Sequence, residues 1–226
     1  MTLNVPPVRL APCSSRALHM EPFSEPEGFF MRVDKSSSEL RGAVALAHFF
    51  LRERVLPGDV VVDATCGSGR DTLLLAQLVG PAGRVWAFDL QAAAIAATRQ
   101  LLAREGQLIR VELVQTGHER LAEFVREPLR AAVFNLGYLP GGDKGFVTEA
   151  KNSQAALNQA AGLLLPAGII TVCIYTGHPG GMEEAEAVEQ WAVRLAPEHF
   201  NVWRNRQLNR PETAPYLVFI EKSGGG

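Results

Sequence analysis

Residues 59–72 read DVVVDATCGSGRDT, and this stretch decides the fold class. Its first part is a continuous run of β-branched residues, as expected of a strand that is buried on both faces of a sheet. Gly67 and Gly69 then allow a sharp turn, and a helix is predicted from Thr72 to Val79. A buried strand that leads through a glycine turn into a helix is typical of α/β proteins with a parallel sheet.

The same alternation continues towards the C-terminus. Further strands are predicted at 84–90, 108–116, 130–138 and 168–176, and helices at 39–55, 91–105, 118–127, 156–165 and 182–196. The last two strands, at 200–208 and 216–222, are joined by NRPETAP, which is too short for a crossover helix and so predicts a hairpin. We therefore expect a doubly wound, mostly parallel, seven-stranded sheet with a C-terminal antiparallel hairpin.

The chain is predicted to hold one folded domain, at residues 36–222. Residues 1–35 are rich in proline and are expected to be a poorly ordered extension, and residues 223–226 are expected to be a flexible tail. A weak organellar transit segment is the alternative interpretation of the extension, set against a cytoplasmic location.

Composition and charge exclude several classes of protein. Hydrophobic residues make up 47% and charged residues 20% of the chain, as in ordinary soluble globular proteins. No apolar run reaches the roughly 18 residues that span a membrane. The net charge of -2 is no general signal of nucleic-acid binding, so any RNA contact has to come from a local basic patch. Candidates for that patch are Arg204, Arg206, Arg210, Lys144 and Lys151.

The three cysteines argue against a metal site. Cys13, Cys66 and Cys173 show no CxxC spacing, which speaks against both a zinc site and a disulfide framework. Cys66 and Cys173 lie at strand ends in apolar surroundings, so we expect them to be small buried hydrophobic residues.

The turn after the first strand differs from a dinucleotide-binding fingerprint. Thr72 occupies the position of the third glycine of G-x-G-x-x-G, and Asp63 precedes the loop. Asp89 ends the second strand, where an acid can accept both ribose hydroxyls of a nucleoside. An acidic tip of the first strand suits a ligand with an ammonium or sulfonium group rather than a pyrophosphate. A GxG alone is a weak signal, but this combination favours S-adenosylmethionine over NAD.

The end of the fourth strand carries the second group of candidate residues. Residues 134–144 read FNLGYLPGGDK. The side-chain carbonyl of Asn135, with a backbone carbonyl, can accept both hydrogens of an amino group and direct its lone pair at a methyl carbon. Gly137 allows close approach of the backbone, and Tyr138 can stack on a flat base. The pattern resembles the N-P-P-Y motif of amino-methyltransferases, with Leu136 and Gly137 in place of the two prolines.

Three histidines and a glutamate-rich helix need separate interpretation. His118 follows the third strand, where it either caps a helix or contacts the cofactor. His48 lies in an apolar helix and is expected to be a packed histidine. His178, in YTGHPGG, is expected at the mouth of the pocket, where it could accept a proton; a plain turn residue is the alternative. The run MEEAEAVEQ at 182–190 is interpreted as a solvated helix face.

Several blocks together resemble the bacterial "putative rRNA methylase" family over residues 38–222. They are DATCGSGRDT (63–72), FDLQ (88–91), FNLGYLPGGDK (134–144), YTGHPGG (175–181) and NRPETAPYLVFIEK (209–222). Members of that family methylate tRNA at the aminomethyl group of 5-aminomethyl-2-thiouridine in the wobble position. The resemblance implies a class I S-adenosylmethionine-dependent methyltransferase with a Rossmann-like fold, which would act on the anticodon region of tRNA in the cytoplasm. The resemblance does not decide whether the protein forms a homodimer.

The resemblance also implies roles for individual residues. It places the cofactor at Asp63, Gly67, Gly69, Asp89, Gln91 and His118, and we add Thr65, Asp71, Thr72 and Asn135 from the same blocks. The expected catalytic residues are Asn135, Tyr138 and His178, and the expected substrate-binding residues are Leu136, Gly137, Pro140, Gly141, Gly142, Asp143 and Lys144.

Other functions remain in competition with this one. The nearest rival is an N-methyltransferase of a small molecule or of rRNA, built on the same fold. A cofactor-binding protein without catalysis is disfavoured by the presence of Asn135 and Asp89, and an NAD-binding module by Asp63 and the missing third glycine.

Overall fold

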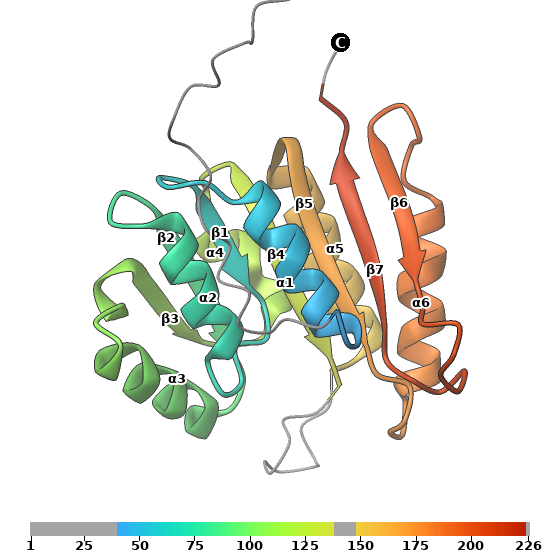
Figure 1. Ribbon diagram of the computed structural model, residues 1–226, viewed down its shortest axis with the longest axis horizontal. Helices are drawn as coiled ribbons and strands as arrows, with labels where there is room; N and C mark the ends of the chain where they lie inside the picture. Colours follow the sequence, from blue (N-terminus) through green and yellow to red (C-terminus); the bar gives the residue numbers. More distant parts are fainter. Residues whose placement is uncertain (1–39, 138–147, 225–226) are drawn as a thin grey trace, which may run out of the picture. The chain divides into compact units, whose positions relative to one another are not determined.

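The computed structural model describes residues 40–137 and 148–224, which contain a seven-stranded mixed sheet with helices on both faces (Figure 1). The strands are β1 (Val60–Asp63), β2 (Arg84–Asp89), β3 (Val111–Gln115), β4 (Leu129–Leu136), β5 (Leu164–Ile174), β6 (Phe200–Asn205) and β7 (Tyr216–Lys222). The main helices are α1 (Ala43–Arg54), α2 (Arg70–Val79), α3 (Ala92–Arg104), α4 (Leu121–Phe124), α5 (Ala150–Leu163) and α6 (Gly181–Val193).

The strand order is β3-β2-β1-β4-β5-β7-β6. Strands β1 to β5 pair in parallel, whereas β7 pairs antiparallel with both β5 and β6. From β1 the chain first builds outward to β2 and β3 and then returns to β4, so the topology reverses between β1 and β4. Ligands bind at the carboxyl ends of strands at such a reversal. The doubly wound sheet with its C-terminal hairpin is confirmed.

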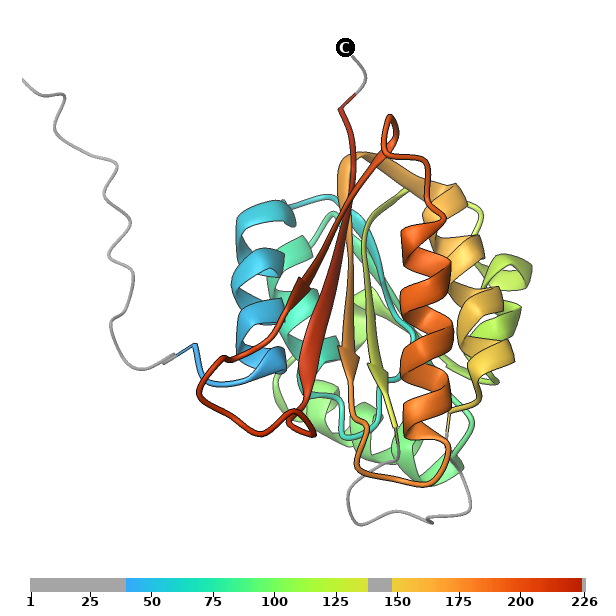
Figure 2. The same cartoon turned by 90° about the vertical axis from the view of Figure 1, so that its right-hand side faces the viewer.

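Two hydrophobic cores hold the helices to the sheet. Along β1, Val61 belongs to the core shared with α1, α2 and α3, and Val62 belongs to the core shared with α5 and α6. Figure 2 shows these two helix layers on opposite sides of the strands. Because neighbouring residues of a strand face opposite sides, a run of consecutive valines is what a strand covered on both faces requires.

Some predicted boundaries are wrong. The helix predicted at 156–165 spans Ala150–Leu163, and the chain enters β5 directly at Leu164. The pairing of β5 with β4 is irregular between Leu129 and Ala131, near Pro166, which lacks a backbone N–H and therefore cannot donate to the ladder. The helix predicted at 118–127 is a 3-10 turn, His118–Arg120, followed by the short α4.

Most of the two predicted chain-end segments lies outside the described residues. The predicted extension at 1–35 lies outside the described residues, all of which belong to one compact unit, Ser38–Gly226. No helix within 40–137 or 148–224 has both the length and the apolar character needed to cross a membrane.

Candidate active site

A cavity of about 570 Å³ opens at the carboxyl ends of β1, β2 and β4. Its wall includes residues from the turns after β1, β2 and β3, together with the tip of β4. A second hollow of about 600 Å³ lies around Arg84 and Glu127 at the opposite end of the strands, where parallel sheets do not place their ligands. The cavity at the strand tips is therefore the candidate active site.

Asp89 is fixed at the cavity wall by two backbone amides. The N–H of Gly67 donates to Oδ2 at 2.9 Å, and the N–H of Gln91 donates to Oδ1 at 2.9 Å. A carboxylate oxygen has room for a second hydrogen bond, so both oxygens can still accept a hydroxyl. Gly67, with φ of 51°, makes the turn that brings its amide to this carboxylate. The arrangement suits the two hydroxyls of a ribose.

Gly69 is needed for packing. It has φ of 82° at the N-terminus of α2, a conformation that residues with a Cβ adopt reluctantly. A Cβ at this position would lie 2.9 Å from the Cα of Thr98 in α3. Gly69 is not among the residues that line the cavity, and it lets α2 and α3 approach closely behind the cavity wall; its predicted cofactor contact stays a prediction.

Asp63 and Thr72 likewise lie behind the wall. Both are completely buried, and the hydroxyl of Thr72 donates to Oδ2 of Asp63 at 2.6 Å. The N–H of Thr65 donates to Oδ1 of Asp63 at 3.2 Å. Burial, reinforced by the negative charge of Asp71, raises the pKa of Asp63 to about 7. Asp63 thus holds the turn after β1 in shape, and the expectation that it meets a positively charged ligand directly is wrong.

His118 lines the cavity instead of capping a helix. It forms no capping bond; its Nδ1 lies 3.2 Å from the carbonyl oxygen of Ala64, to which it donates. Burial lowers the pKa of His118, which keeps the imidazole neutral and leaves Nε2 with a lone pair. Nε2 is buried and has no hydrogen-bond partner within the described part of the chain. It can therefore accept a hydrogen bond from a bound molecule.

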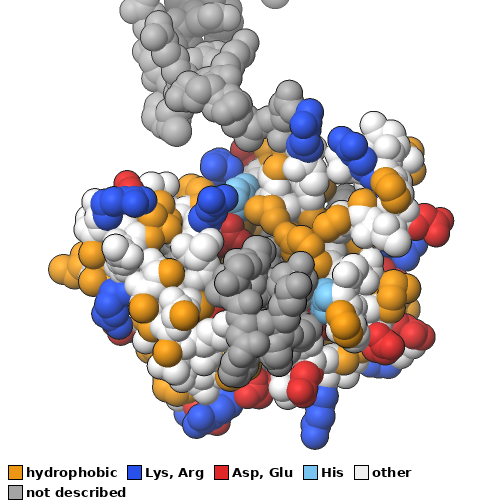
Figure 3. Space-filling view, turned by 90° about the horizontal axis from the view of Figure 1, so that it is seen from below, with side chains coloured by type: hydrophobic (Ala, Val, Ile, Leu, Met, Phe, Trp, Pro, Cys, Tyr) orange, Lys and Arg blue, Asp and Glu red, His pale blue; other side chains and the backbone are white. Residues whose placement is uncertain are grey.

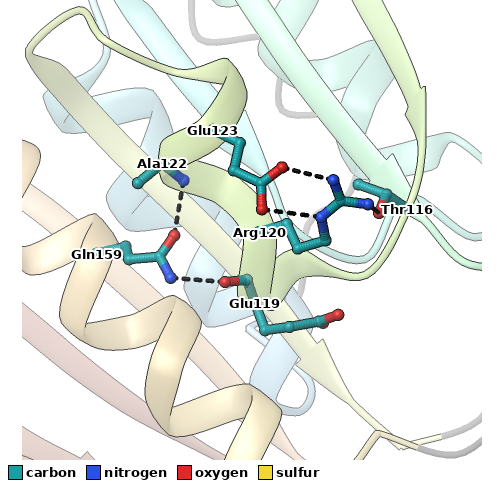
Figure 4. A network of polar contacts seen from close by, with 6 residues as sticks. All are labelled: Thr116, Glu119, Arg120, Ala122, Glu123 and Gln159. Atoms are coloured by element: carbon teal, nitrogen blue, oxygen red, sulfur yellow. Dashed lines mark hydrogen bonds and ion pairs between the residues drawn. The ribbon is translucent and has the colours of Figure 1, made fainter.

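The cavity wall after β3 is held by α5 (Figure 4). Gln159 accepts the N–H of Ala122 at 2.6 Å and donates to the carbonyl oxygen of Glu119 at 2.6 Å. Arg120 donates to the hydroxyl of Thr116 at 3.3 Å on the exposed side of the same turn. These contacts fix the backbone of the segment that carries His118 into the cavity.

Asn135 is placed at the cavity by the turn after β1 and by α2. Its backbone N–H donates to Oγ1 of Thr65 at 2.8 Å, and its side-chain Nδ2 donates to Oδ2 of Asp71 at 2.6 Å. Its Oδ1 is buried and meets no hydrogen-bond partner among the described residues. A buried carbonyl oxygen without a partner costs about 1–3 kcal/mol, which a ligand that donates a hydrogen bond would offset.

His48 is a site residue that the sequence did not reveal. Its Nε2 lies 2.6 Å from Oδ1 of Asp71, so it contacts the carboxylate that holds Asn135. His48 was expected to be a packed, satisfied histidine, and its hydrogen bond to Asp71 bears this out; the partner is a carboxylate that lines the cavity. His48 follows Val44 by one helical turn, so in the structure it lies on the same face of α1 as a residue that lines the cavity.

The position of Glu184 also overturns an expectation. It lies in the glutamate-rich helix but is only 1% exposed. Its carboxylate accepts the hydroxyls of Thr148 at 2.6 Å and Ser153 at 2.5 Å. The N–H of Thr148 in turn donates to the carbonyl oxygen of Gly137 at 3.1 Å. Glu184 therefore ties the start of α5 to α6 beside the tip of β4.

The predicted site residues that have not been corrected above divide into four groups. The residues that line the cavity are Thr65, Gly67, Asp71, Asp89, Gln91, His118, Asn135 and Gly137. Leu136 is fully buried in the core, so its predicted substrate contact is wrong. His178 lies beside the tip of β4, with Nε2 3.5 Å from where a Cβ on Gly137 would sit. Tyr138, Pro140, Gly141, Gly142, Asp143 and Lys144 lie outside the described residues.

Comparison with known proteins decides the family. Residues 85–221 match the family model described as "Putative rRNA methylase". The chain belongs to this family. A relative in Arabidopsis thaliana, "tRNA (mnm(5)s(2)U34)-methyltransferase, chloroplastic", is 39% identical over 192 residues, which cover 80% of this chain and 69% of the relative. The resemblance inferred from the motifs is therefore confirmed.

Solved structures of similar proteins support the same fold. A "putative rRNA-methylase" from Clostridium thermocellum is 41% identical with a TM-score of 0.79, over 80% of this chain and 98% of that one. A "putative methyltransferase" from Streptococcus mutans, solved in complex with SAH, is 34% identical with a TM-score of 0.73, over 80% and 97%. The class I methyltransferase fold expected from the sequence is confirmed.

Proposed function

We propose that this protein methylates the primary amine of 5-aminomethyl-(2-thio)uridine at the wobble position of tRNA, giving the methylaminomethyl form. The name of the Arabidopsis relative, at 39% identity, supports this substrate. The observation in the structure that carries the proposal is the buried, unpartnered Oδ1 of Asn135 at the cavity end of β4. An acceptor at this point suits a nucleophile that brings N–H hydrogens.

The cavity fits S-adenosylmethionine. Its volume of about 570 Å³ lies in the usual range for small-molecule sites, roughly 300–1,000 Å³. Asp89 would accept the ribose hydroxyls, and the free Nε2 of His118 would accept an N–H of the bound molecule. When bound, this cofactor supplies an electrophilic methyl group on a positively charged sulfur.

The residues of the chain then have to orient an amine and remove a proton from it. A primary aliphatic amine is mostly an ammonium ion near neutral pH, and the ammonium form has no lone pair with which to attack. Oδ1 of Asn135 accepts one N–H and directs the nitrogen into the cavity. His178, beside Gly137, is the residue proposed to accept the proton that the ammonium loses.

Nucleoside mass spectrometry tests the proposed reaction. Purified protein is incubated with labelled S-adenosylmethionine and with tRNA that carries aminomethyluridine, and that nucleoside should gain one methyl group. Asn135→Ala should lower the rate of transfer by at least about 100-fold, to a residual rate that can still be measured. Methylation of rRNA, or of a small molecule but no tRNA, would replace the proposed substrate. His178→Ala should lower turnover, and unchanged turnover across about pH 6.5 to 9 would remove His178 from the mechanism.

Contact with the anticodon region of tRNA is part of this proposal. Positive side chains are spread around the periphery of the end that holds the strand tips and are mixed with acidic ones (Figure 3). Of the hairpin arginines, Arg204 pairs with Glu189 at 3.1 Å and Arg206 stacks on Tyr216 at 4.5 Å, which fixes both at the surface. Binding of tRNA should therefore weaken as the salt concentration rises.

The oligomeric state is a separate part of the proposal. Light scattering with and without tRNA decides between a monomer and a homodimer.

We also propose a cytoplasmic location, with an organelle as the alternative. The Arabidopsis relative is named as chloroplastic, which supports the alternative. A fluorescent fusion of the full chain, compared with a fusion that lacks residues 1–35, decides between them. Organellar signal that depends on residues 1–35 would identify the extension as a targeting segment.

A further inference from the structure

Three side chains from separate elements form a chain of hydrogen bonds at the position where the acceptor amine is proposed to bind. His48 comes from α1, Asp71 from the first turn of α2, and Asn135 from the tip of β4. Asp71 is central: its Oδ1 lies 2.6 Å from Nε2 of His48, and its Oδ2 lies 2.6 Å from Nδ2 of Asn135. The side chain of Asp71 is only 12% exposed and that of His48 is 24% exposed, so the contact is largely shielded from water.

The chemistry of a carboxylate decides how the Asn135 amide is oriented. An asparagine amide carries a donor on one side and an acceptor on the other, and rotation by half a turn exchanges them. An ionised carboxylate only accepts hydrogen bonds, so the amide has to present Nδ2 to Asp71 and Oδ1 to the opposite side. That opposite atom is the buried oxygen without a partner in the described structure.

The surroundings keep Asp71 ionised. Burial alone would raise its pKa, but the hydrogen bond and charge of His48, the hydrogen bond of Asn135 and the charge of Arg70 together hold the pKa below its usual range. The other carboxyl group that faces Asp71 is Asp63, whose pKa is raised to about 7, so Asp63 takes up a proton before Asp71 does. Asp71 therefore remains an acceptor throughout the neutral range.

We propose that Asp71 and His48 are positioning residues that lock the Asn135 amide with its oxygen towards the cavity, and so restrict the acceptor to a group that donates N–H. The inference rests on the proposed function only in placing the acceptor amine at Asn135. A reversed amide would set its NH₂ against the hydrogens of the incoming amine, which removes a hydrogen bond and opposes two donors. His48 contributes by fixing the carboxylate, because its N–H occupies the oxygen that Asn135 does not use.

The His48–Asp71 contact would also hold α1 to α2 if its role were purely structural. The test therefore has to separate this structural role from the positioning of the Asn135 amide. If Asp71 acts through Asn135, its removal matters only while Asn135 is present. We therefore compare Asp71→Asn, Asn135→Ala and the double variant by kcat, by KM for aminomethylated tRNA, and by calorimetric affinity for S-adenosylmethionine. Asp71→Asn should lower kcat about 100-fold with little change in cofactor affinity, and should add nothing in the Asn135→Ala background.

Variants of His48 provide a rescue test with a matched control. Glutamine can present an N–H near the place of Nε2, so His48→Gln should retain most of the wild-type kcat, whereas His48→Leu should lower kcat about tenfold. His199→Leu serves as the control, because His199 is exposed and outside the cavity wall. Equal losses in His48→Gln and His48→Leu, or additive losses in the Asp71 and Asn135 pair, would overturn the positioning role.

A spectroscopic readout keeps the inference independent of activity. The side-chain amide of Asn135 can be assigned in ¹H–¹⁵N spectra by its disappearance in Asn135→Ala. Its signals should move in Asp71→Asn and in His48→Leu, but not in His199→Leu. Signals that stay in place in both Asp71→Asn and His48→Leu refute the lock, whether or not any tRNA is methylated. If the signals move while no tRNA is methylated, the lock stands and the proposed substrate fails. Should Asp71→Asn not fold, His48→Leu gives the same reading.

Discussion

Replacing Asp63 with asparagine should change how the stability of the protein depends on pH. Asp63 is fully buried at the end of β1, where burial and the nearby charge of Asp71 raise its pKa from 3.8 to about 7. An asparagine fits the same contacts: its oxygen can accept the N–H of Thr65, and its NH₂ can donate to the hydroxyl of Thr72, which reverses its own role. The substitution therefore removes the titration with little loss of hydrogen bonding.

The sign and size follow from linkage between proton binding and folding. Between pH 3.8 and about 7 the folded protein holds a proton on Asp63 that the unfolded chain has lost, so wild-type stability falls as pH rises through this window. Each pH unit within the window changes the free energy of unfolding by about 1.4 kcal/mol. From pH 5 to pH 7 the contribution of Asp63 should therefore fall by about 2 kcal/mol, and above about pH 8 it should level off.

Urea unfolding followed by tryptophan fluorescence at pH 5, 6, 7 and 8 measures this effect. The free energy of unfolding of Asp63→Asn, minus that of the wild type, should rise by about 2 to 3 kcal/mol between pH 5 and pH 7. Glu53→Gln removes an exposed acid and should follow the wild-type profile at every pH. A difference between Asp63→Asn and the wild type that stays constant with pH would refute the assignment of a raised pKa to Asp63.

Three further predictions concern the walls of the cavity. Asp89→Ala should weaken S-adenosylmethionine binding by about 10- to 100-fold in calorimetry, because the residue could no longer accept the ribose hydroxyls or hold the amides of Gly67 and Gln91; Glu105→Ala, at an exposed acid, should bind normally. Gly69→Ala should lower the free energy of unfolding by about 1–3 kcal/mol, through a strained φ of 82° and a contact of 2.9 Å; an unchanged midpoint would contradict the close packing of α2 and α3. Glu184→Ala should lower it by about 2–4 kcal/mol, since the two hydroxyls that the carboxylate accepts lose their partner; thermal unfolding checks this, and a loss below about 0.5 kcal/mol would count against it.

Much of the fold could be predicted from the amino-acid sequence, because the strands, helices and turns follow local sequence patterns. The valines of 60–62 identified a strand covered on both sides, and the short NRPETAP link identified the antiparallel hairpin of β6 and β7. The ends of the helices and strands were harder to predict from the sequence. The start of β5 at Leu164 depends on pairing with β4, which a helical apolar pattern before Pro166 does not reveal.

The sequence predicted where the candidate site lies in the fold. It did not predict reliably which residues line the cavity and which are buried behind it. Gly67, Asp89 and Asn135 stand at strand ends, and parallel strands bring their carboxyl ends together at one edge. Asp63 and Thr72 belong to the same motif, but both side chains are completely buried. They bond to each other rather than facing the cavity. Membership of a motif therefore did not distinguish a residue that touches a ligand from one that shapes the turn.

The sequence by itself determined the α/β class, the order of elements, the family and the strand tips that build the cavity, since all of these follow from periodicity, turns and short motifs. Only the tertiary structure decided that His48 reaches Asp71, that Asp71 holds the amide of Asn135, and that Glu184 is buried against two hydroxyls. These contacts join residues far apart in the chain. Their existence depends on how the helices pack against the sheet, and no local pattern carries that information.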